Sequence, residues 1–483
     1  QARNPLPERD GLINRVDQIS SALEKFDKSD APFIWAVLNH ALGQAFTILN
    51  NTPDALDKAI QFHLSALEVF SLEESPYLWS LVKHDLGISY YERAVGDKAE
   101  NIEQEIDCFE DALKVRTRDK FPSDWQASTA NLAAAQMSRV GNNEKEGIEN
   151  AILIYEQLLE HLSKQDSPQY FANAHNNAGL AWFYKTNYSD NNSDKHFSYS
   201  QSIKHYELAL QIYTEDDLPE DWAMSKLNLG NSLSFRGDSG DMLNAKISYQ
   251  DALRVYNLEQ FPIEWAKTKL GLGFMHWNLN EFDESIAIYS EMEKNCTGPN
   301  LLLFRVHAAG ALGMIYHEQK DWKLSYDHLK ISLQSANELR LDMYTQDSKI
   351  YFNRAPSYYH QYMVKACIEL NLLREAFEYA ESGKSRLFLE QLATDSSIIA
   401  EYMNIPRDFL KKEAMLLEEL RHIENKLRDD LDRKESRLYT QRQEEIVSRL
   451  KEIWNDLETE FPLYASLRRG TPVSYEQVIE FLN

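Results

Sequence analysis

Cysteine is scarce in this chain of 483 residues, which contains Cys108, Cys296 and Cys367 and no others. The three are far apart, odd in number and form no Cys-x-x-Cys pair, which argues against disulfides and against a cysteine zinc site. Such usage is typical of a reducing compartment. We therefore expect a cytoplasmic protein in which the three thiols are small, buried, apolar groups.

Other scarcities exclude further classes of protein. Glycine and proline number only 17 and 14, which argues against an all-β chain. No apolar run approaches the ~18–20 residues that span a membrane, so no membrane partner is expected. Basic residues are outnumbered, the net charge is −25, and such a surface repels phosphate backbones, so direct nucleic-acid binding is not expected. Because the first residue is Gln1, we expect the native N-terminus to be missing or processed.

Motifs for catalysis and cofactor binding are also lacking. The sequence contains no His-Glu-x-x-His, no Gly-x-Ser-x-Gly and no Gly-x-Gly-x-x-Gly, and its 13 histidines form no cluster at ligand spacing. No catalytic residue, cofactor or metal site is therefore predicted in this chain.

What the sequence does contain is an internal repeat. A Pro-x-x-aromatic motif recurs at intervals of 43–51 residues, and a small residue stands eight positions after each aromatic. The motifs are Pro32–Trp35, Pro76–Trp79, Pro122–Trp125, Pro168–Phe171, Pro219–Trp222 and Pro262–Trp265. The small residues are Gly43, Gly87, Ala133, Gly179, Gly230 and Gly273. We expect each proline to begin a helix, where its missing N–H costs nothing, and each small residue to allow a neighbouring helix to approach closely.

A second helix is predicted after each of these. Its spacing of 4 and 3 residues places a small, a large and a further apolar side chain on one helical face. Examples are Ala59–His63–Ala66, Ala151–Tyr155–Leu158, Ser202–Tyr206–Ala209 and Ala245–Tyr249–Ala252. Gly313, Tyr316, Trp322 and Ser325 fit a seventh unit, and Tyr362, Leu370, Ala376 and Ala380 fit an eighth. Helix pairs of this pattern resemble the tetratricopeptide repeat, whose unit has about 34 residues. The excess length here is expected to lie mostly between the two helices of a unit.

The triplet Gly383-Lys384-Ser385 has the ending of a phosphate-binding loop, Gly-x₄-Gly-Lys-Ser/Thr. Glu378 occupies the position of the first glycine, and the preceding "REAFEYAES" indicates a helix, whereas the loop follows a strand. Nucleotide binding is therefore disfavoured. In the repeat register Gly383 takes the last small position of a second helix, where it would serve close packing at a cost of ~1 kcal/mol relative to alanine.

Beyond about residue 404 the pattern changes. Apolar residues step by three and four, first at Leu416, Leu420, Ile423, Leu427 and Leu431, and again at Ile446, Leu450, Ile453, Leu457 and Phe461. This predicts an antiparallel coiled-coil hairpin or one long interrupted helix. Pro462 ends the helix, and "SYEQVIEFL" is expected to form a short amphipathic helix capped by Ser474.

Three stretches, in this order, resemble the TPR-CHAT proteins, which are caspase-like peptidases with an N-terminal tetratricopeptide array. They are the Pro-x-x-Trp repeats, the stretch "YYHQYMVKACIELNLLREAFEYAESGKSRLFLEQL", and the hairpin followed by "PLYASLRRGTPVSYEQVIEFL". The second contains the family's Ala-Glu-x-x-Lys-x-Arg pattern at Ala380, Glu381, Lys384 and Arg386. The resemblance implies a peptidase domain beyond residue 483 that carries the catalytic His and Cys. No catalytic residue can be transferred to this chain.

The expected organisation is all-α, a tetratricopeptide-repeat superhelical solenoid followed by a long helical hairpin. We predict a cap at residues 1–31, about eight repeats at 32–395, a coiled-coil hairpin at 396–461 and a linker with a short helix at 462–483, leading to a further C-terminal domain.

Stacked repeats create an extended groove, and the repeat register gives candidates for its lining. They are His40, Gln44, His84, Ile88, Asn176, Leu180, Asn231 and Trp277. The predicted function is a sensor arm of a bacterial caspase-like peptidase, which binds a protein or peptide in the groove and relays that binding to the peptidase domain. For some members the resemblance implies a role in anti-phage defence. The alternative is a stand-alone adaptor without enzymatic activity.

Overall fold

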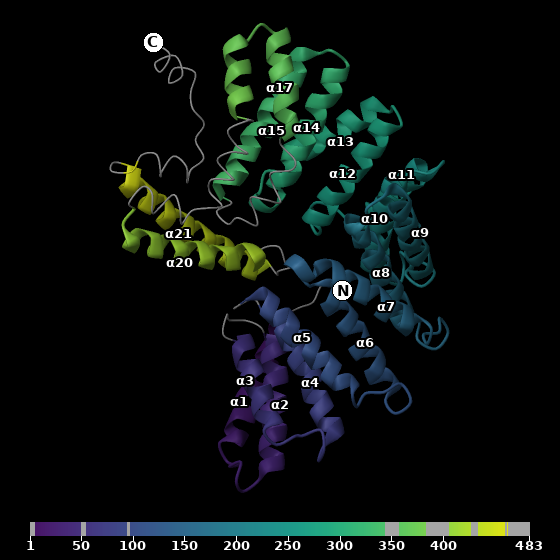
Figure 1. Cartoon of the computed structure of the whole chain (residues 1–483), viewed down its shortest axis with the longest axis vertical. Helices are drawn as coiled ribbons and strands as arrows, with labels where there is room; N and C mark the ends of the chain where they lie inside the picture. The colour runs from purple at the N-terminus through teal and green to yellow at the C-terminus, as the bar shows by residue number, and fades with distance from the viewer. Residues whose placement is uncertain are drawn as a thin grey trace. The chain divides into compact units, whose positions relative to one another are not determined.

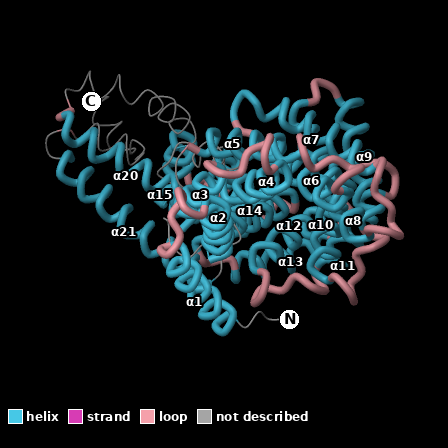
Figure 2. The backbone as a smooth tube through the Cα atoms, turned by 90° about the horizontal axis from the view of Figure 1, so that it is seen from below, coloured by secondary structure: helices cyan, strands magenta, loops and turns pink. Residues whose placement is uncertain are grey.

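The computed structural model describes residues 5–49, 55–93, 97–342, 357–382, 405–426, 433–458 and 461. These residues form helices and loops, with no strand among them (Figure 2). The chain divides into two compact units, unit 1 (Gln1–Asp241) and unit 2 (Met242–Asn483). In both units consecutive helices pack as pairs, so the predicted all-α repeat fold is confirmed (Figure 1).

Unit 1 begins with α1 (Pro5–Leu23), which packs on the first repeat helix. The first helices of its repeats are α2 (Pro32–Leu49), α4 (Pro76–Glu92), α6 (Pro122–Met137), α8 (Pro168–Lys185) and α10 (Pro219–Arg236). The second helices are α3 (Ala55–Leu67), α5 (Lys98–Leu113), α7 (Glu144–Leu159) and α9 (Asn192–Ala209). The 3₁₀ turns η1 (Gly141–Asn143) and η2 (Thr186–Tyr188) lie between the partners of two pairs. Each first helix starts at its predicted proline.

The small residues of the repeat register lie at close helix contacts, as predicted. An ideal Cβ built on Gly43 would lie 2.6 Å from the His63 ring, and one on Gly179 would lie 2.9 Å from the Tyr206 ring. The large side chain of each second helix therefore lies directly over the backbone of the first. This contact explains why a helix interior carries glycine in spite of its low helix propensity.

The sequence analysis expected the extra length of each repeat mostly between the two helices of a pair, and the structure differs. Within a pair the loops are short, as at 186–191, whereas the connectors to the next pair are longer, as at 68–75, 114–121, 160–167 and 210–218. These connectors contribute to the core, because each buries one side chain beneath the next first helix. The buried residues are Phe70, Arg116, Leu162 and Tyr213.

Unit 2 contains α11 (Asp241–Ala252), α12 (Pro262–Asn278), α13 (Phe282–Asn295), η3 (Pro299–Leu301), α14 (Leu302–Glu318), α15 (Trp322–Asp342) and α17 (Ser357–Glu369). A further helical stretch covers 373–382. The pair α14–α15 is the predicted seventh repeat, and α17 with the stretch 373–382 is the eighth. The Tyr289 ring on α13 lies over Gly273, and the Leu329 side chain on α15 lies over Gly313, so the small-residue contact also recurs here.

The helices α20 (Arg407–Lys426) and α21 (Arg433–Glu458) pack against each other as an antiparallel hairpin. Ile405 near the start of α20 contacts Leu457 near the end of α21, while Leu420 and Ile423 contact Ile446 and Leu450. This arrangement settles the two alternatives that the sequence left open, in favour of the hairpin. Trp454, which the periodic pattern did not mark, is also buried, and its indole N–H donates to Glu413 at 2.7 Å.

One described helix, α2, is long and apolar enough to cross a bilayer by composition alone. Its apolar residues Ala36, Leu42 and Ala45 are buried, and α2 packs against α1, α3 and α4, whereas Phe33, Val37 and Ile48 of the same helix are exposed. The three cysteines are buried and unpaired, as expected. The predictions for Gly383, for Leu427 and Leu431, and for the segment 462–483 lie outside the described residues.

Candidate functional site

The first helices form the inner layer of unit 1. Three of the four successive pairs of first helices in unit 1 approach each other, α2 with α4, α6 with α8 and α8 with α10, whereas no two successive second helices described in unit 1 approach as closely. The stack of pairs in unit 1 is therefore curved towards the first helices. The side chains of the first helices that point away from the second helices line the inner face of this unit. The repeat register placed the candidate groove residues on this face.

Asp85 on α4 joins the first two repeats. Its Oδ2 accepts hydrogen bonds from His40 Nε2 at 2.8 Å and from Gln44 Nε2 at 2.7 Å, both on α2. Burial raises the pKa of the Asp85 carboxyl, but these two hydrogen bonds outweigh it and the net pKa is lowered. Two predicted groove residues, His40 and Gln44, are thus held by a carboxylate that the sequence analysis did not single out. His40 is buried and Gln44 is exposed.

A second polar chain joins α4, α6 and the connector before α6. His84 Nδ1 lies 3.0 Å from Ser128 Oγ, which also accepts a hydrogen bond from Arg116 Nη1 at 3.0 Å. Burial, followed by the nearby guanidinium of Arg116, lowers the pKa of His84 to about 4. His84 is therefore neutral at pH 7.

A serine beside a histidine suggests a nucleophile with its base, but this pair lacks the other requirements. Ser128 is fully buried, and its other partner is a cation, where a nucleophilic serine needs open access to substrate. The pair therefore serves to link neighbouring repeats.

Arg116 is a buried cation without an ion pair within the described part of the chain. Its side chain is 2% exposed, its Nε has no partner, and the equivalent positions in other repeats are Phe70, Leu162 and Tyr213. Because removing an unpaired buried charge relieves desolvation, we expect Arg116→Met to leave stability unchanged or to raise it by about 1 kcal/mol. Ser128→Ala, which leaves the guanidinium unsatisfied, should lower stability by about 2 kcal/mol. Urea unfolding measures both. A loss with Arg116→Met as large as that with Ser128→Ala would contradict this assignment.

The other predicted groove residues take no part in the hydrogen bonds of Asp85 or of Ser128. Asn176 on α8 is buried and accepts a hydrogen bond from Ser225 on α10 at 3.0 Å. Ile88, Leu180 and Asn231 are half-buried on α4, α8 and α10. Trp277 belongs to unit 2, where its indole N–H donates to Glu318 on α14 at 3.2 Å. Several register positions of the candidate groove thus join successive first helices to each other.

Four exposed apolar side chains of the inner layer were missed. Ile48, Tyr91, Tyr184 and Phe235 stand at the C-terminal ends of α2, α4, α8 and α10, and they are 68%, 61%, 39% and 63% exposed. We call these four residues the apolar edge. Each follows the small residue of its repeat by four or five positions, so the register contained a signal. The groove candidates came from the middle of each first helix, so the register position near the helix end was not among them.

The N-terminal halves of the same helices are also apolar. Phe33, Val37, Tyr77 and Met224 are exposed on α2, α4 and α10, and the middle helix α6 contributes only alanines, at Ala127, Ala130 and Ala134. A contiguous exposed apolar surface of this kind marks an interaction site. The acidic groups of the chain fall largely elsewhere, for instance on the second helices at Glu110, Glu149 and Glu156.

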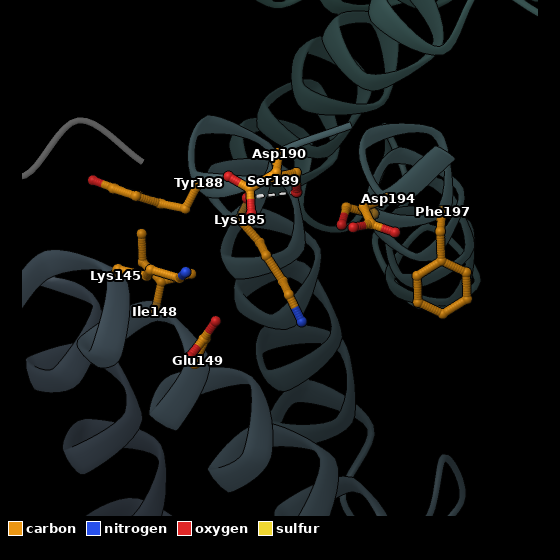
Figure 3. A pocket seen from close by; sticks show the side chains of 10 residues that line it. Lys145, Ile148, Glu149, Lys185, Tyr188, Ser189, Asp190, Asp194 and Phe197 are labelled. Atoms are coloured by element: carbon orange, nitrogen blue, oxygen red, sulfur yellow. Dashed lines mark hydrogen bonds between the residues drawn. The ribbon is translucent and has the colours of Figure 1, made fainter. Parts of the chain in front are cut away.

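A cavity of about 280 Å³ lies between α7, η2 and α9. Figure 3 shows the Lys185 side chain between Glu149 and Asp194, with Phe197 at the rim. The ammonium of Lys185 lies 4.6 Å from the centre of the Trp182 ring. The lining mixes lysines and carboxylates with Ile148, Tyr188 and Phe197, whereas small-molecule sites are mostly apolar. The inner face is therefore the stronger candidate.

No family model matches the chain, and no curated protein matches it.

Proposed function

We propose that the chain is a protein-binding scaffold, and that the inner face of unit 1 holds a polypeptide partner. The observation that carries this proposal is the set of exposed apolar side chains along the first helices, from Phe33 and Val37 to Phe235. Apolar and aromatic groups with few charges are the composition of the centre of a protein interface. The partner is a protein or peptide, with no direct nucleic acid and no membrane.

The finer proposal follows the resemblance to TPR-CHAT proteins. On this proposal the array is the sensor arm of a bacterial caspase-like peptidase in the cytoplasm, active in anti-phage defence, and the hairpin α20–α21 relays partner binding to a downstream peptidase domain. The hairpin supports this role because its two helices pack through two apolar clusters that both contact Ile453, so a displacement of one helix would shift the other. The alternative, a stand-alone adaptor, is distinguished by the reading frame beyond residue 483.

The binding surface is tested by photo-crosslinking in cells. A photoreactive residue replaces Val37 on the inner face in one variant and Leu64 on the second helix α3 in the other; their exposures are similar, 41% and 47%. We expect protein adducts from position 37 and few from position 64. Equal adducts from both positions would remove the inner face as the binding surface.

The sensor role needs a second measurement with the partner identified in this way. Full-length protein is expected to cleave its substrate only when that partner is present. Cleavage at full rate without the partner would contradict the sensor role and leave the binding surface intact.

A further inference from the structure

One second helix departs from the repeat pattern at a buried position. The residue four places before the large core residue is small in six of the seven second helices from α3 to α15. These small residues are Ala59, Ala151, Ser202, Ala245, Ser285 and Ser325. The seventh is Glu105 on α5, which is only 3% exposed. Because a buried carboxylate is costly unless it is paired, this exception needs a physical explanation.

The serines at this position show which chemistry the site favours. Three of them donate their hydroxyl groups to the backbone carbonyl of the small residue on the paired first helix. The bonds run from Ser202 to Gly179, from Ser285 to Gly273 and from Ser325 to Gly313, at 2.7, 3.0 and 2.8 Å. A carbonyl oxygen accepts hydrogen bonds and donates none, so the site favours a side chain that donates.

The second repeat has the same geometry. An ideal Cβ on Gly87 of α4 would lie 2.9 Å from the Phe109 ring, as one on Gly179 would lie 2.9 Å from the Tyr206 ring. The repeat register therefore places Glu105 beside the Gly87 carbonyl. A glutamate donates to this acceptor only when its carboxyl group is protonated, since a carboxylate only accepts hydrogen bonds.

The charged groups nearest to Glu105 do not favour a carboxylate. Glu92, the last residue of α4, adds a like charge, and burial together with Glu92 raises the pKa of Glu105 to about 8. The guanidinium of Arg93, which follows α4, donates instead to Asp57 at 2.8 Å and to Asn101 at 3.0 Å. Within the described part of the chain, no cation pairs with Glu105.

Other charged groups of α5 and of its two neighbours, α4 and α6, have partners of their own or face solvent. The paired groups are Lys83 with Asp111, Asp85 with His40 and Arg139 with Glu103. The exposed groups of α5 are Lys98, Glu100, Asp107 and Glu110. The one charged residue of α6 is Asp124 in its first turn, which accepts from Tyr77. None of these groups compensates a negative charge at position 105.

We propose that Glu105 holds a proton in the folded chain and makes the joint between α4 and α5 sensitive to pH. When the carboxyl group loses this proton it can no longer donate, and a buried charge then stands beside Glu92, so the two helices separate at this level. Because α4 also carries Asp85, which holds His40 and Gln44 of α2, opening of the joint loosens the inner face of the second repeat. The joint does not depend on which partner the inner face binds.

Ionisation of Glu105 favours the open joint at high pH. In the open joint the carboxyl group ionises near its ordinary pKa of 4.5, whereas in the closed joint its pKa is about 8. The stabilising contribution of the proton is therefore complete below about pH 4.5 and is lost as the pH rises through about 8. Between pH 6.5 and pH 9 we expect the equilibrium constant for opening to rise about thirtyfold.

Cys108, a buried thiol on α5, reports opening of the joint in the full chain. N-ethylmaleimide reaches it only in the open joint, and mass spectrometry of the peptide that contains Cys108 gives the labelling rate. The parent chain is compared at pH 6.5 and pH 9 with Glu105→Gln, which keeps the size and a donor and cannot ionise. We expect the rate to rise about thirtyfold more in the parent, since the ionisation of the thiol itself is common to both chains.

Cys296, which is buried in unit 2, is the internal control. Its labelling is expected to respond to pH in the same way in the parent and in Glu105→Gln. Equal rises at Cys108 in both chains would overturn the proposal. A difference at Cys296 as large as that at Cys108 would also overturn it, because the opening would then not be local to α4 and α5.

Infrared difference spectroscopy detects the proton directly. We expect the parent to lose absorption of a protonated carboxyl group between pH 6.5 and pH 9, and Glu105→Gln to lack this change. Glu105→Ser is the second variant, because serine occupies this position in three other repeats, and the same absence is expected for it. No loss in the parent, or the same loss in both variants, would overturn the proposal.

Discussion

Replacing Gly147 with alanine is expected to lower the free energy of unfolding by about 3 kcal/mol, although alanine favours a helix over glycine by about 1 kcal/mol. Gly147 is buried in the first turn of α7. A Cβ there would lie 2.2 Å from the carbonyl oxygen of Gln136 and 2.9 Å from the Cβ of Arg139. The first of these atoms belongs to the backbone, so α6 and α7 must move apart. Such a movement also disturbs Arg139, which pairs with Glu103 at 2.8 Å.

The matched control is Gly11→Ala in α1, where the added methyl group meets no atom within 4 Å. There the helix propensity acts alone, and we expect stability to rise by up to about 1 kcal/mol. Urea unfolding followed by circular dichroism compares the midpoints of the two variants with that of the parent chain. If Gly147→Ala unfolds at the parent midpoint, the close approach of α6 to α7 is wrong.

Much of the fold could be predicted because one repeat explains many residues at once. The prolines Pro32, Pro76 and Pro122 mark helix starts directly, since a proline at the first helical position needs no N–H donor. Glycines such as Gly43 and Gly179 mark helix contacts for an equally local reason. The connectors were harder, because 114–121 reads as a polar loop in sequence and yet buries Arg116 beneath α6.

The candidate site was only partly predictable. The register placed His40, Gln44 and His84 on first helices, where the structure has them, but it could not tell residues that face the groove from residues that link repeats. That distinction depends on what stands one repeat later, such as Asp85 opposite His40 or Ser128 opposite His84. The apolar edge was accessible in principle, because Ile48 and Phe235 occupy the same register position. An exposed apolar residue, however, carries no periodic signal of its own in one sequence.

Buried histidines make the stability of unit 1 dependent on pH. Burial lowers the pKa of His63 to about 3, with a further contribution from His40, and neither ring nitrogen of His63 has a hydrogen-bond partner. Burial likewise lowers the pKa values of His175 and His205, whose Nδ1 atoms lie 2.8 Å apart, to about 4 and about 3. The folded chain keeps these rings neutral at pH values where the unfolded chain, with a histidine pKa near 6.5, takes up protons.

The contribution of these histidines to stability is therefore greatest above about pH 6.5 and falls as the pH decreases towards the folded-state pKa values near 3 to 4. Each such histidine is expected to cost about 2 kcal/mol at pH 5. His63→Phe isolates one of them, because the equivalent residue of the next repeat is Phe109, which covers Gly87 as His63 covers Gly43.

We expect His63→Phe to be at least as stable as the parent chain at pH 7 and to lose about 2 kcal/mol less than it between pH 7 and pH 5. Urea unfolding of the parent chain and of His63→Phe at pH 7, 6 and 5 gives the two slopes. Parallel curves for the parent and His63→Phe would mean that the His63 ring takes up its proton in the folded state, which its complete burial in the core of the first repeat opposes.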